Sequence, residues 1–267
     1  MNELTPGKKL NAIEKALEIM LRFQETKPSW GIRELSGQLG FSPATVQRIL
    51  KTLKNYEFVC QDEKTRQYAI GNVFYRFLEN LNSSNDLART GRKFMEEVAQ
   101  ATQETVHLNI IQGYQRICID TIESPQTLKA GMPIGNQSPL YAGASAKCLL
   151  AFSPDVFRAD YFRAVQVAPL TANTIVAPDA LAGELDKIQS IGYAQSMGER
   201  TPGLGSLSAP VFDYKGSILA SLSLAIPEIR FQEPDHLTHC TQILTRAARN
   251  FSKAMGLHDT DFTPISS

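Results

Sequence analysis

The sequence predicts an α+β fold in two domains: a small helical N-terminal domain that ends in a hairpin, and a larger C-terminal domain of sheet and helices. Its 267 residues fit roughly two domains, and its 43% hydrophobic and 20% charged residues are ordinary for a folded protein. Apolar residues first recur with helical spacing and later alternate as in strands. Disordered, collagen-like and coiled-coil chains are therefore excluded.

No stretch approaches the roughly 18 apolar residues that a membrane-spanning helix needs, and the first ten residues lack the apolar segment of a signal peptide. We therefore expect a cytoplasmic protein with no membrane partner. The four cysteines are far apart in the sequence and form no CxxC pair, which favours reduced thiols over a disulfide framework.

The net charge of zero hides a difference between the two ends of the chain. Residues 1–66 contain 11 basic and 8 acidic residues, a net charge of +3, and the remaining 16 basic and 19 acidic residues give −3. The segment 42–56 holds Arg48, Lys51 and Lys54 and no acidic residue. Such a basic stripe fits contact with a phosphate backbone.

Two helices are predicted before this stripe. The first spans residues 10–23, where apolar residues three and four positions apart define one helix face. These residues are Ile13, Leu17, Met20 and Leu21. The second helix, 32–39, ends at Gly40, which suits a left-handed C-cap.

A third helix is predicted to begin at Ser42-Pro43, because serine caps free amides and proline at the first position loses no hydrogen bond. Its buried stripe comprises Val46, Ile49, Leu50 and Leu53. Small and polar residues near its start allow close approach to base edges, and the basic residues further along can reach phosphates.

Strand-like runs at 58–61 and 67–70 flank a polar turn and predict a hairpin. Helix, helix, turn, helix and hairpin is the order of a winged helix-turn-helix, which reads DNA with its third helix. The residues predicted to contact DNA are Ser42, Ala44, Thr45, Gln47, Arg48, Lys51, Lys64 and Arg66. The alternative, a helical protein-binding domain with a solvated charged face, explains this ordered combination less well.

The rest of the chain predicts a connecting helix and an α+β domain. A helix over 72–81 runs into the polar stretch 82–86, which is typical of a linker. The predicted strands are 104–112, 115–123, 205–211 and 218–226, and the predicted helices are 87–100, 144–152, a short one from Pro154, 178–190 and 234–255. The predicted domains are residues 1–71, a linker helix at 72–86, residues 87–257 and a tail at 258–267.

A ligand pocket is one interpretation of the small residues Gly143–Lys147, because free amides and the dipole at a helix start favour an anion such as a carboxylate. A tightly packed helix start without a ligand explains this fragment equally well. The strands that follow carry Ser206 and Ser208, and Ser221 and Ser223, each pair on one face. If this hydroxyl face meets the helix start, it forms a pocket for a small organic acid. If it faces water, it is the solvated side of a sheet.

Other signals for chemistry are weak. His236 and His239 lie beside Cys240 at a spacing compatible with metal ligation, but a further ligand is missing, so no metal is predicted. His107, on a predicted strand, favours a hydrogen-bonded structural histidine. No catalytic triad, Cys/His pair or paired carboxylates can be assembled, so neither enzymatic activity nor a cofactor is predicted.

Several longer motifs occur in both halves of the chain. In the first half they are Ala12-Ile-Glu-Lys-Ala-Leu-Glu-Ile, Ser42-Pro-Ala-Thr-Val-Gln-Arg-Ile-Leu-Lys-Thr-Leu and Tyr68-Ala-Ile-Gly71. In the second half they are Pro139-Leu-Tyr-Ala-Gly-Ala-Ser-Ala-Lys-Cys-Leu-Leu-Ala151, Ile191-Gly-Tyr193, Glu199, Ala209-Pro-Val-Phe-Asp213, and Pro227 with Arg230. Together these motifs resemble the IclR family of bacterial transcription regulators, and the match runs from about Leu10 to Met255 in the family's order.

The resemblance implies a winged-helix domain, a linking helix and a GAF-like effector domain that binds a small organic acid. It also implies a homodimer or homotetramer on a palindromic double-stranded DNA operator. The residues do not decide between repression and activation, although repression is slightly favoured. The other class of function considered is an enzymatic or metabolite-sensing α+β domain with a helical protein-interaction module. It would need an acid, base or nucleophile in the pocket, where mainly serines are found.

The effector contacts implied by the resemblance are the amides near Ala144 and Ser145 and the side chains at Ser196, Ser206, Ser223 and Ala225. Family members that bind very small keto-acids usually carry an acid, a cysteine and two serines at the last four positions. This chain lacks that charge and one hydroxyl. The departure favours a larger or less polar effector, such as an aromatic acid.

Overall fold

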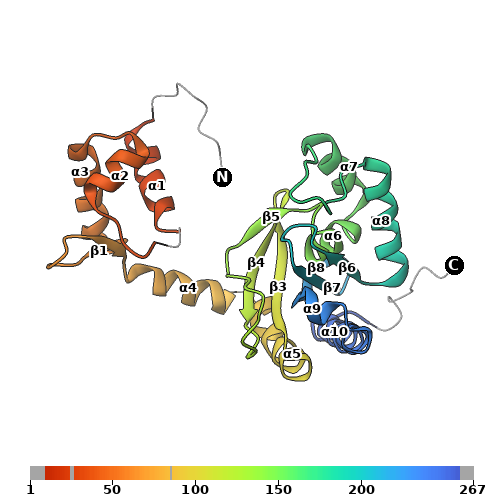
Figure 1. The fold of residues 1–267 in the computed structure, drawn as a ribbon. Coiled ribbons are helices and arrows are strands. Elements are labelled where there is room, and N and C mark those ends of the chain that lie inside the picture. Colours follow the sequence, from red (N-terminus) through yellow and green to blue (C-terminus); the bar gives the residue numbers. More distant parts are fainter. Residues whose placement is uncertain (1–9, 25–26, 85, 259–267) are drawn as a thin grey trace. The chain divides into compact units, whose positions relative to one another are not determined.

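The computed structural model describes residues 10–24, 27–84 and 86–258, so almost all of the predicted tail lies outside the described residues. The chain divides into two compact units, Met1–Ser84 and Asn85–Ser267 (Figure 1). The N-terminal unit contains α1 (Ala12–Arg22), α2 (Ile32–Leu39), α3 (Pro43–Asn55), β1 (Val59–Gln61), β2 (Tyr68–Ile70) and α4 (Val73–Ser84). Since β1 and β2 pair as an antiparallel hairpin, the predicted winged helix-turn-helix is confirmed.

The caps predicted around the turn between α2 and α3 are present. Gly40 adopts a left-handed φ of 67° after α2. The Ser42 hydroxyl accepts a hydrogen bond from the Thr45 amide at 3.2 Å, and Pro43 is the first residue of α3. α2 therefore ends, and α3 begins, where the local sequence dictates.

The apolar face predicted for α1 is not the one that packs. Ile13, Leu17 and Leu21 are 73%, 58% and 50% exposed, whereas Ile19 is fully buried and Met20 packs against the same core. The helix carries apolar residues on two sides, and a three-helix core accepts only one of them. Spacing alone could not decide between the two sides.

α4 lies within the linker helix predicted at 72–86 and ends later than the 72–81 that apolar spacing indicated. α4 continues to Ser84, through most of the polar run that favoured a linker, and the next helix begins at Asp86. Serine and asparagine each cost a helix only a few tenths of a kcal/mol more than its best formers do, so polarity alone does not end it. α4 belongs to the N-terminal unit.

The C-terminal unit is the predicted α+β domain. Its elements are α5 (Asp86–Thr102), β3 (Thr105–Gln112), β4 (Gln115–Ile122), β5 (Gln137–Pro139), α6 (Ala144–Ala151), α7 (Asp155–Ala164), α8 (Pro178–Ile191), β6 (Ala194–Met197), β7 (Leu204–Phe212), β8 (Ile218–Pro227), α9 (Glu228–Phe231) and α10 (Pro234–Ala254). The strands form one sheet in the order β5-β4-β3-β8-β7-β6, with every neighbouring pair antiparallel. β5, β6 and α9 were not predicted.

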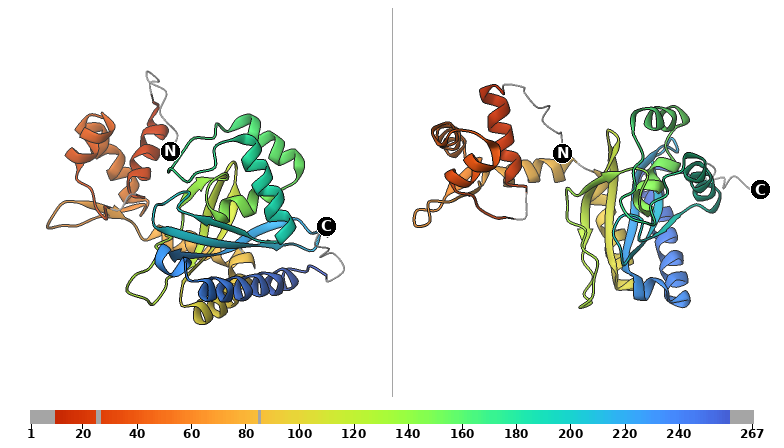
Figure 2. Two further views of the ribbon diagram at one scale, coloured as in Figure 1. Left: turned by 45° about the vertical axis from the view of Figure 1, so that its right-hand side comes forward. Right: turned by 45° about the horizontal axis from the view of Figure 1, so that its top comes forward.

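Helices cover both faces of this sheet. α5 and α10 pack on one face, around a core that includes Leu108, Leu207, Leu222 and Phe251 (Figure 2). α6, α7 and α8 lie on the other side, over a second core. Because side chains alternate along a strand, the serines of β7 and β8 point toward α6.

Candidate functional site

The hydroxyl face of the sheet meets α6 and does not face water, so the interpretation of this face as the solvated side of a sheet is wrong. The β7–β8 register places Ser208 opposite Ser223, and the two hydroxyl oxygens lie 2.8 Å apart with both residues fully buried. The Ser221 hydroxyl donates to the carbonyl of Ser145 in α6 at 3.3 Å.

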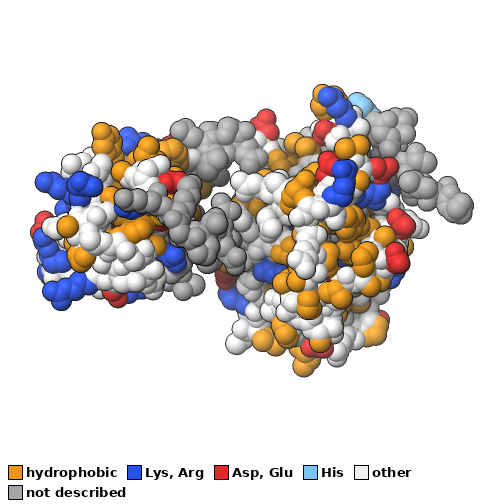
Figure 3. All heavy atoms as spheres, turned by 90° about the horizontal axis from the view of Figure 1, so that it is seen from above, with side chains coloured by type: hydrophobic (Ala, Val, Ile, Leu, Met, Phe, Trp, Pro, Cys, Tyr) orange, Lys and Arg blue, Asp and Glu red, His pale blue; other side chains and the backbone are white. Residues whose placement is uncertain are grey.

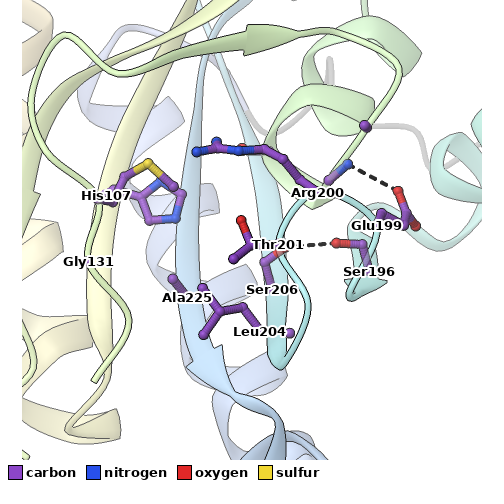
Figure 4. A pocket seen from close by; sticks show the side chains of 14 residues that line it. His107, Gly131, Ser196, Glu199, Arg200, Thr201, Leu204, Ser206 and Ala225 are labelled. Atoms are coloured by element: carbon purple, nitrogen blue, oxygen red, sulfur yellow. Dashed lines mark hydrogen bonds between the residues drawn. The ribbon is translucent and has the colours of Figure 1, made fainter. Parts of the chain in front are cut away.

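A pocket that is partly open to solvent lies between the start of α6, the β6–β7 connection and the neighbouring ends of β3 and β8 (Figure 4). Four residues predicted to contact an effector line it: Ser145, Ser196, Ser206 and Ala225.

The other two predicted residues lie behind the pocket wall. Ser223 is fully buried, and its hydroxyl contacts Ser208 and accepts from Asn109 Nδ2 at 3.3 Å. The Ala144 amide donates to the hydroxyls of Ser196 and Ser206 at 3.1 and 3.2 Å, and these hydroxyls are 2.9 Å from each other. The expectation of a free amide at Ala144 is therefore wrong, because neighbouring serines satisfy it.

The protein's own carboxylate occupies the start of α6. Glu199, from the β6–β7 connection, accepts from the Gly143 amide at 3.0 Å through Oε2 (Figure 4). Its Oε1 lies 2.6 Å from Nζ of Lys147, which also contacts Glu184 at 2.8 Å. Lys147 is buried, so the charge of Glu199 is balanced inside the protein. The electropositive helix start thus holds an anion already.

His107 lines the pocket with an unsatisfied nitrogen, so the prediction of a hydrogen-bonded structural histidine is wrong for one of its two nitrogens. The imidazole is buried, and Nε2 has no hydrogen-bond partner in the described part of the chain. Burial, and then the charge of Arg116, lower the pKa of His107 to about 3, so the ring is neutral.

Asn109 determines which nitrogen carries the proton. Nδ1 of His107 lies 2.9 Å from Nδ2 and 3.2 Å from Oδ1 of Asn109. Because Oδ1 also accepts from Nη1 of Arg116 at 3.3 Å, we take the closer Nδ2 as the hydrogen-bond partner of Nδ1. We assign Nδ1 as the acceptor of that bond. A neutral ring then carries its proton on Nε2, which is a free donor at the pocket.

Two guanidinium groups make this side of the pocket positive. Arg200 lines the pocket and donates to Oδ1 of Asn136 at 2.9 Å. Arg116 is fully buried and donates only to neutral groups, which include the Ser138 hydroxyl at 3.0 Å and the Asn136 carbonyl at 3.1 Å. Neither guanidinium forms an ion pair with a carboxylate among the residues that the structure describes.

Burial, followed by the charge of Arg200, lowers the pKa of Arg116 to about 10, and burial also lowers the pKa of Arg200. Arg116 nevertheless stays charged near pH 7.

Sequence reasoning gave no ligand role to His107, Arg116, Glu199 or Arg200. One signal was present: Arg116 directly precedes the apolar run Ile117-Cys-Ile119 of β4. Charged residues are almost never fully buried without a partner, so this position could have been flagged.

The predicted DNA-contacting residues lie on the surface of α3 and at the hairpin tip, with Thr45 half-buried and the others exposed. The Ser42 hydroxyl is also engaged in the cap of α3. Arg48, Lys51, Lys64 and Arg66 form no ion pair with any residue in the described ranges. Figure 3 shows Lys and Arg side chains gathered at the end of the N-terminal unit that carries the hairpin tip.

The hairpin tip is shaped by Asp62. Its Oδ1 accepts from the Lys64 amide at 3.0 Å, the Thr65 amide at 2.6 Å and the Thr65 hydroxyl at 2.9 Å. The bonds from Thr65 contribute most to a lowered pKa of Asp62. Arg66 follows in a left-handed conformation, with φ of 59°. The turn thus places Lys64 and Arg66 at its tip.

The two histidines of α10 have other contacts. His236 Nε2 lies 2.9 Å from a carboxylate oxygen of Glu104, and His239 Nε2 lies 3.2 Å from the carbonyl of Ala101. Across the described ranges, no three His, Cys, Asp or Glu residues are grouped to hold a metal. Within the same ranges, no helix is long and apolar enough to cross a membrane.

The lowered pKa of His107 predicts a loss of stability in mild acid. The unfolded chain takes up a proton below pH 6.5, while the folded protein resists protonation until about pH 3, so stability falls as pH decreases through this window. At pH 5.5 the loss from this group is about 1.4 kcal/mol. We expect His107→Gln to lose correspondingly less stability than the wild type between pH 7.5 and 5.5 in urea denaturation. Equal losses in both proteins would contradict the burial of a neutral imidazole.

Comparison with known proteins matches both units to one family. The family described as "Bacterial transcriptional regulator IclR C-terminal" matches residues 80–253, and the "IclR helix-turn-helix domain" matches residues 12–63. The HTH-type transcriptional regulator KdgR of Escherichia coli (strain K12) is 32% identical over 232 residues, covering 87% of this chain and 88% of that regulator.

Solved structures share the fold. The Thermotoga maritima IclR structure has a TM-score of 0.80 at 26% identity and covers 93% of this chain and 100% of that one. An IclR homologue from Microbacterium hydrocarbonoxydans, solved in complex with 4-hydroxybenzoate, has a TM-score of 0.79 at 16% identity and covers 92% of this chain and 99% of that one.

Proposed function

This chain belongs to the IclR family of bacterial transcriptional regulators, and from that premise we propose that it binds a palindromic DNA operator under the control of a small organic acid. The family consists of DNA-binding regulators with an effector-binding C-terminal domain, not of enzymes. The observation that carries the choice of an acid is the positive charge beside the pocket, where Arg116 and Arg200 have only neutral partners in the described part of the chain. An anion that enters the pocket would neutralise it.

An aromatic acid is the class of effector that we favour. Beside its polar groups, the pocket presents the apolar side chains of Met132, Ala142, Leu204 and Ala225. A ring needs such a surface, and a very small keto-acid does not. That the homologue of the same fold holds 4-hydroxybenzoate supports the idea that this fold has room for an aromatic acid.

For the operator, we propose that α3 enters the major groove and that the hairpin tip contacts the flanking backbone. Ala44 and Gln47 lie near the start of α3. The small side chain of Ala44 allows close approach to base edges, and the polar side chain of Gln47 can form hydrogen bonds with them. Arg48 and Lys51 follow on the exposed side, and Lys64 and Arg66 stand at the hairpin tip. Base contacts would give specificity, and phosphate contacts would supply most of the salt-dependent affinity.

The exposed apolar stripe on α1 supports a homodimer. Ile13, Leu17 and Leu21 follow one another at four-residue spacing and are half-exposed or more. A symmetric dimer would bury the same stripe of both copies against each other, and its twofold axis would match a palindromic operator. Tetramers would arise by pairing such dimers.

Regulation then requires that the acid prefer one arrangement of the dimer. We propose that occupation of the pocket changes the spacing of the two α3 helices through α4, which follows the hairpin directly in the chain. The effector can shift operator affinity only by the ratio of its affinities for the two arrangements. We favour repression that the acid relieves.

A gel-shift experiment tests this proposal. The full-length protein is titrated onto the DNA upstream of its own gene, with and without pyruvate, gluconate, benzoate or 4-hydroxybenzoate at equal ionic strength. We expect a specific complex whose affinity changes with at least one acid, most strongly with an aromatic one. A specific complex that no acid alters would contradict control by these acids, and failure to bind this DNA would count against the proposed operator.

A larger side chain in the pocket should weaken binding of the acid. Leucine in place of Ala225, which lines the pocket, adds three carbon atoms to the cavity wall, so we expect at least roughly tenfold weaker acid binding with DNA binding retained. Ala180→Leu, at an exposed position of α8, is the matched control. Isothermal titration calorimetry measures the first effect and a gel shift the second. An unchanged affinity for the acid in Ala225→Leu would place the effector elsewhere.

A further inference from the structure

The start of α6 is closed to an incoming carboxylate. The Gly143 amide is bound to Glu199, and the Ala144 amide to the hydroxyls of Ser196 and Ser206. A second carboxylate beside Glu199 would meet a like charge at hydrogen-bond distance, which is unfavourable. Lys147 is shared between Glu184 and Glu199, so it has no charge to spare for a ligand.

The opposite side of the pocket has the reverse arrangement. Figure 4 shows the Arg200 side chain extending across the pocket toward His107. Among the residues that the structure describes, its one hydrogen-bond partner is the neutral side chain of Asn136, and the buried guanidinium of Arg116 shares the same Oδ1 at 3.1 Å. Two cations that converge on one amide oxygen repel each other, and burial in a low dielectric makes this more costly. An anion bound between the two guanidinium groups would reduce this repulsion.

The unpartnered nitrogen of His107 supplies an independent observation. Nε2 is buried, has no hydrogen-bond partner in the described ranges and belongs to a residue that lines the pocket. A buried donor without a partner costs stability until a ligand accepts its hydrogen bond. An anion held by Arg200 on the His107 side would provide that acceptor.

Charge counting limits the ligand to one negative charge. Around the pocket stand the three cations Lys147, Arg116 and Arg200, and the two carboxylates Glu184 and Glu199. One positive charge remains, and a single carboxylate would cancel it. A dianion would leave the region negative.

Building on the proposed function, we propose that Arg200 is the residue that binds the effector's carboxylate, that His107 Nε2 donates a second hydrogen bond to it, and that Glu199 keeps the α6 start closed. The effector is a monocarboxylate. Its remaining atoms lie against Ala225, Leu204 and Ser206, away from the guanidinium. Specificity for an acid over its neutral analogues therefore resides in Arg200 and not in the helix amides.

The test compares an acid with its neutral amide in five full-length proteins. Benzoate with benzamide, and 4-hydroxybenzoate with 4-hydroxybenzamide, are titrated by calorimetry into the wild type, Arg200→Met, Arg200→Lys, His107→Leu and the control Arg163→Met. Arg163 is exposed on α7 and paired only with Asp160 at the surface. Pyruvate with pyruvamide and gluconate with gluconamide extend the panel to small and sugar acids.

We expect the wild type to bind an acid more tightly than its amide. Arg200→Met should weaken acid binding roughly 10- to 100-fold while leaving amide binding unchanged, and Arg200→Lys should retain part of the preference. His107→Leu should weaken acid binding by a smaller factor of roughly two to ten. Arg163→Met should behave as the wild type does.

Two further results separate the possible failures. If Arg200→Met binds the acid as tightly as the wild type does, or if its affinities for the acid and the amide fall by the same factor, the assignment of Arg200 is wrong while the proposed function stands. If no acid in the panel binds the wild type, the proposed function itself fails.

The unfolding temperature distinguishes a purely structural role of Arg200 from a role in ligand binding. Without ligand, Arg200→Met should unfold at no lower temperature than the wild type, because it relieves repulsion with Arg116. A large drop in that temperature, with the acid-to-amide ratio unchanged, would show that Arg200 only supports the fold.

Discussion

Replacement of Lys147 by methionine is expected to lower the free energy of unfolding of the C-terminal unit by about 3–5 kcal/mol. Lys147 is fully buried and is the one residue that links Glu184 and Glu199, at 2.8 and 2.6 Å. Methionine fills similar volume but leaves the buried carboxylate of Glu199 without its cation. Urea denaturation followed by circular dichroism measures the loss. The single tryptophan, Trp30, lies in the N-terminal unit, so its fluorescence provides an internal control that should not change.

A second substitution separates lost charge balance from lost packing. Glu199→Gln keeps an oxygen that can accept from the Gly143 amide but removes the charge. We therefore expect Lys147→Met combined with Glu199→Gln to recover more than half of the stability lost in Lys147→Met. Glu184→Gln alone should have a small effect, because Glu184 is partly solvated. A loss below about 1 kcal/mol in Lys147→Met would show that this ion pair does not hold the pocket wall in place.

Local sequence signals predicted the elements well, because the forces behind them act within a few residues. Gly40 and Ser42-Pro43 mark the ends of α2 and the start of α3 through backbone conformation and capping. Alternation along β7 and β8 correctly grouped the serines on one face. Pattern alone could not choose the core-facing side of α1, since two apolar sides competed for one core.

The charges around the pocket could not be inferred in this way. Arg116 lies on β4, Lys147 on α6, and Glu199 and Arg200 between β6 and β7, so their proximity depends on the completed sheet. The glycine- and alanine-rich start of α6 suggested an anion site, but no local signal showed that Glu199, far along the chain, would fill it. The sequence also could not predict how deeply each serine is buried. Ser206 and Ser223 face the same side of the sheet, yet only Ser206 lines the pocket.

Replacement of Arg48 by alanine is expected to produce the largest loss of operator affinity. A base-contacting arginine contributes about 1–3 kcal/mol, and in a symmetric dimer each substitution acts at both half-sites, so the loss should reach about 2–6 kcal/mol. Arg48 is exposed on α3 and forms no ion pair within the described residues, so its loss should leave folding nearly unchanged. Fluorescence anisotropy with labelled operator and with scrambled DNA, at several salt concentrations, measures the effect.

Two variants distinguish base contact from phosphate contact. If Arg48 touches bases, Arg48→Ala weakens operator binding far more than binding to scrambled DNA. Lys51→Ala, a phosphate contact in this assignment, should weaken both alike and reduce the salt slope by about 0.9 per half-site. Lys187→Ala, at an exposed position of α8, removes the same charge from the other unit and should have little effect. Loss in Lys187→Ala as large as in Arg48→Ala would show that net charge, and not α3, governs binding. Full affinity in Arg48→Ala at every salt concentration would mean that another surface reads the operator.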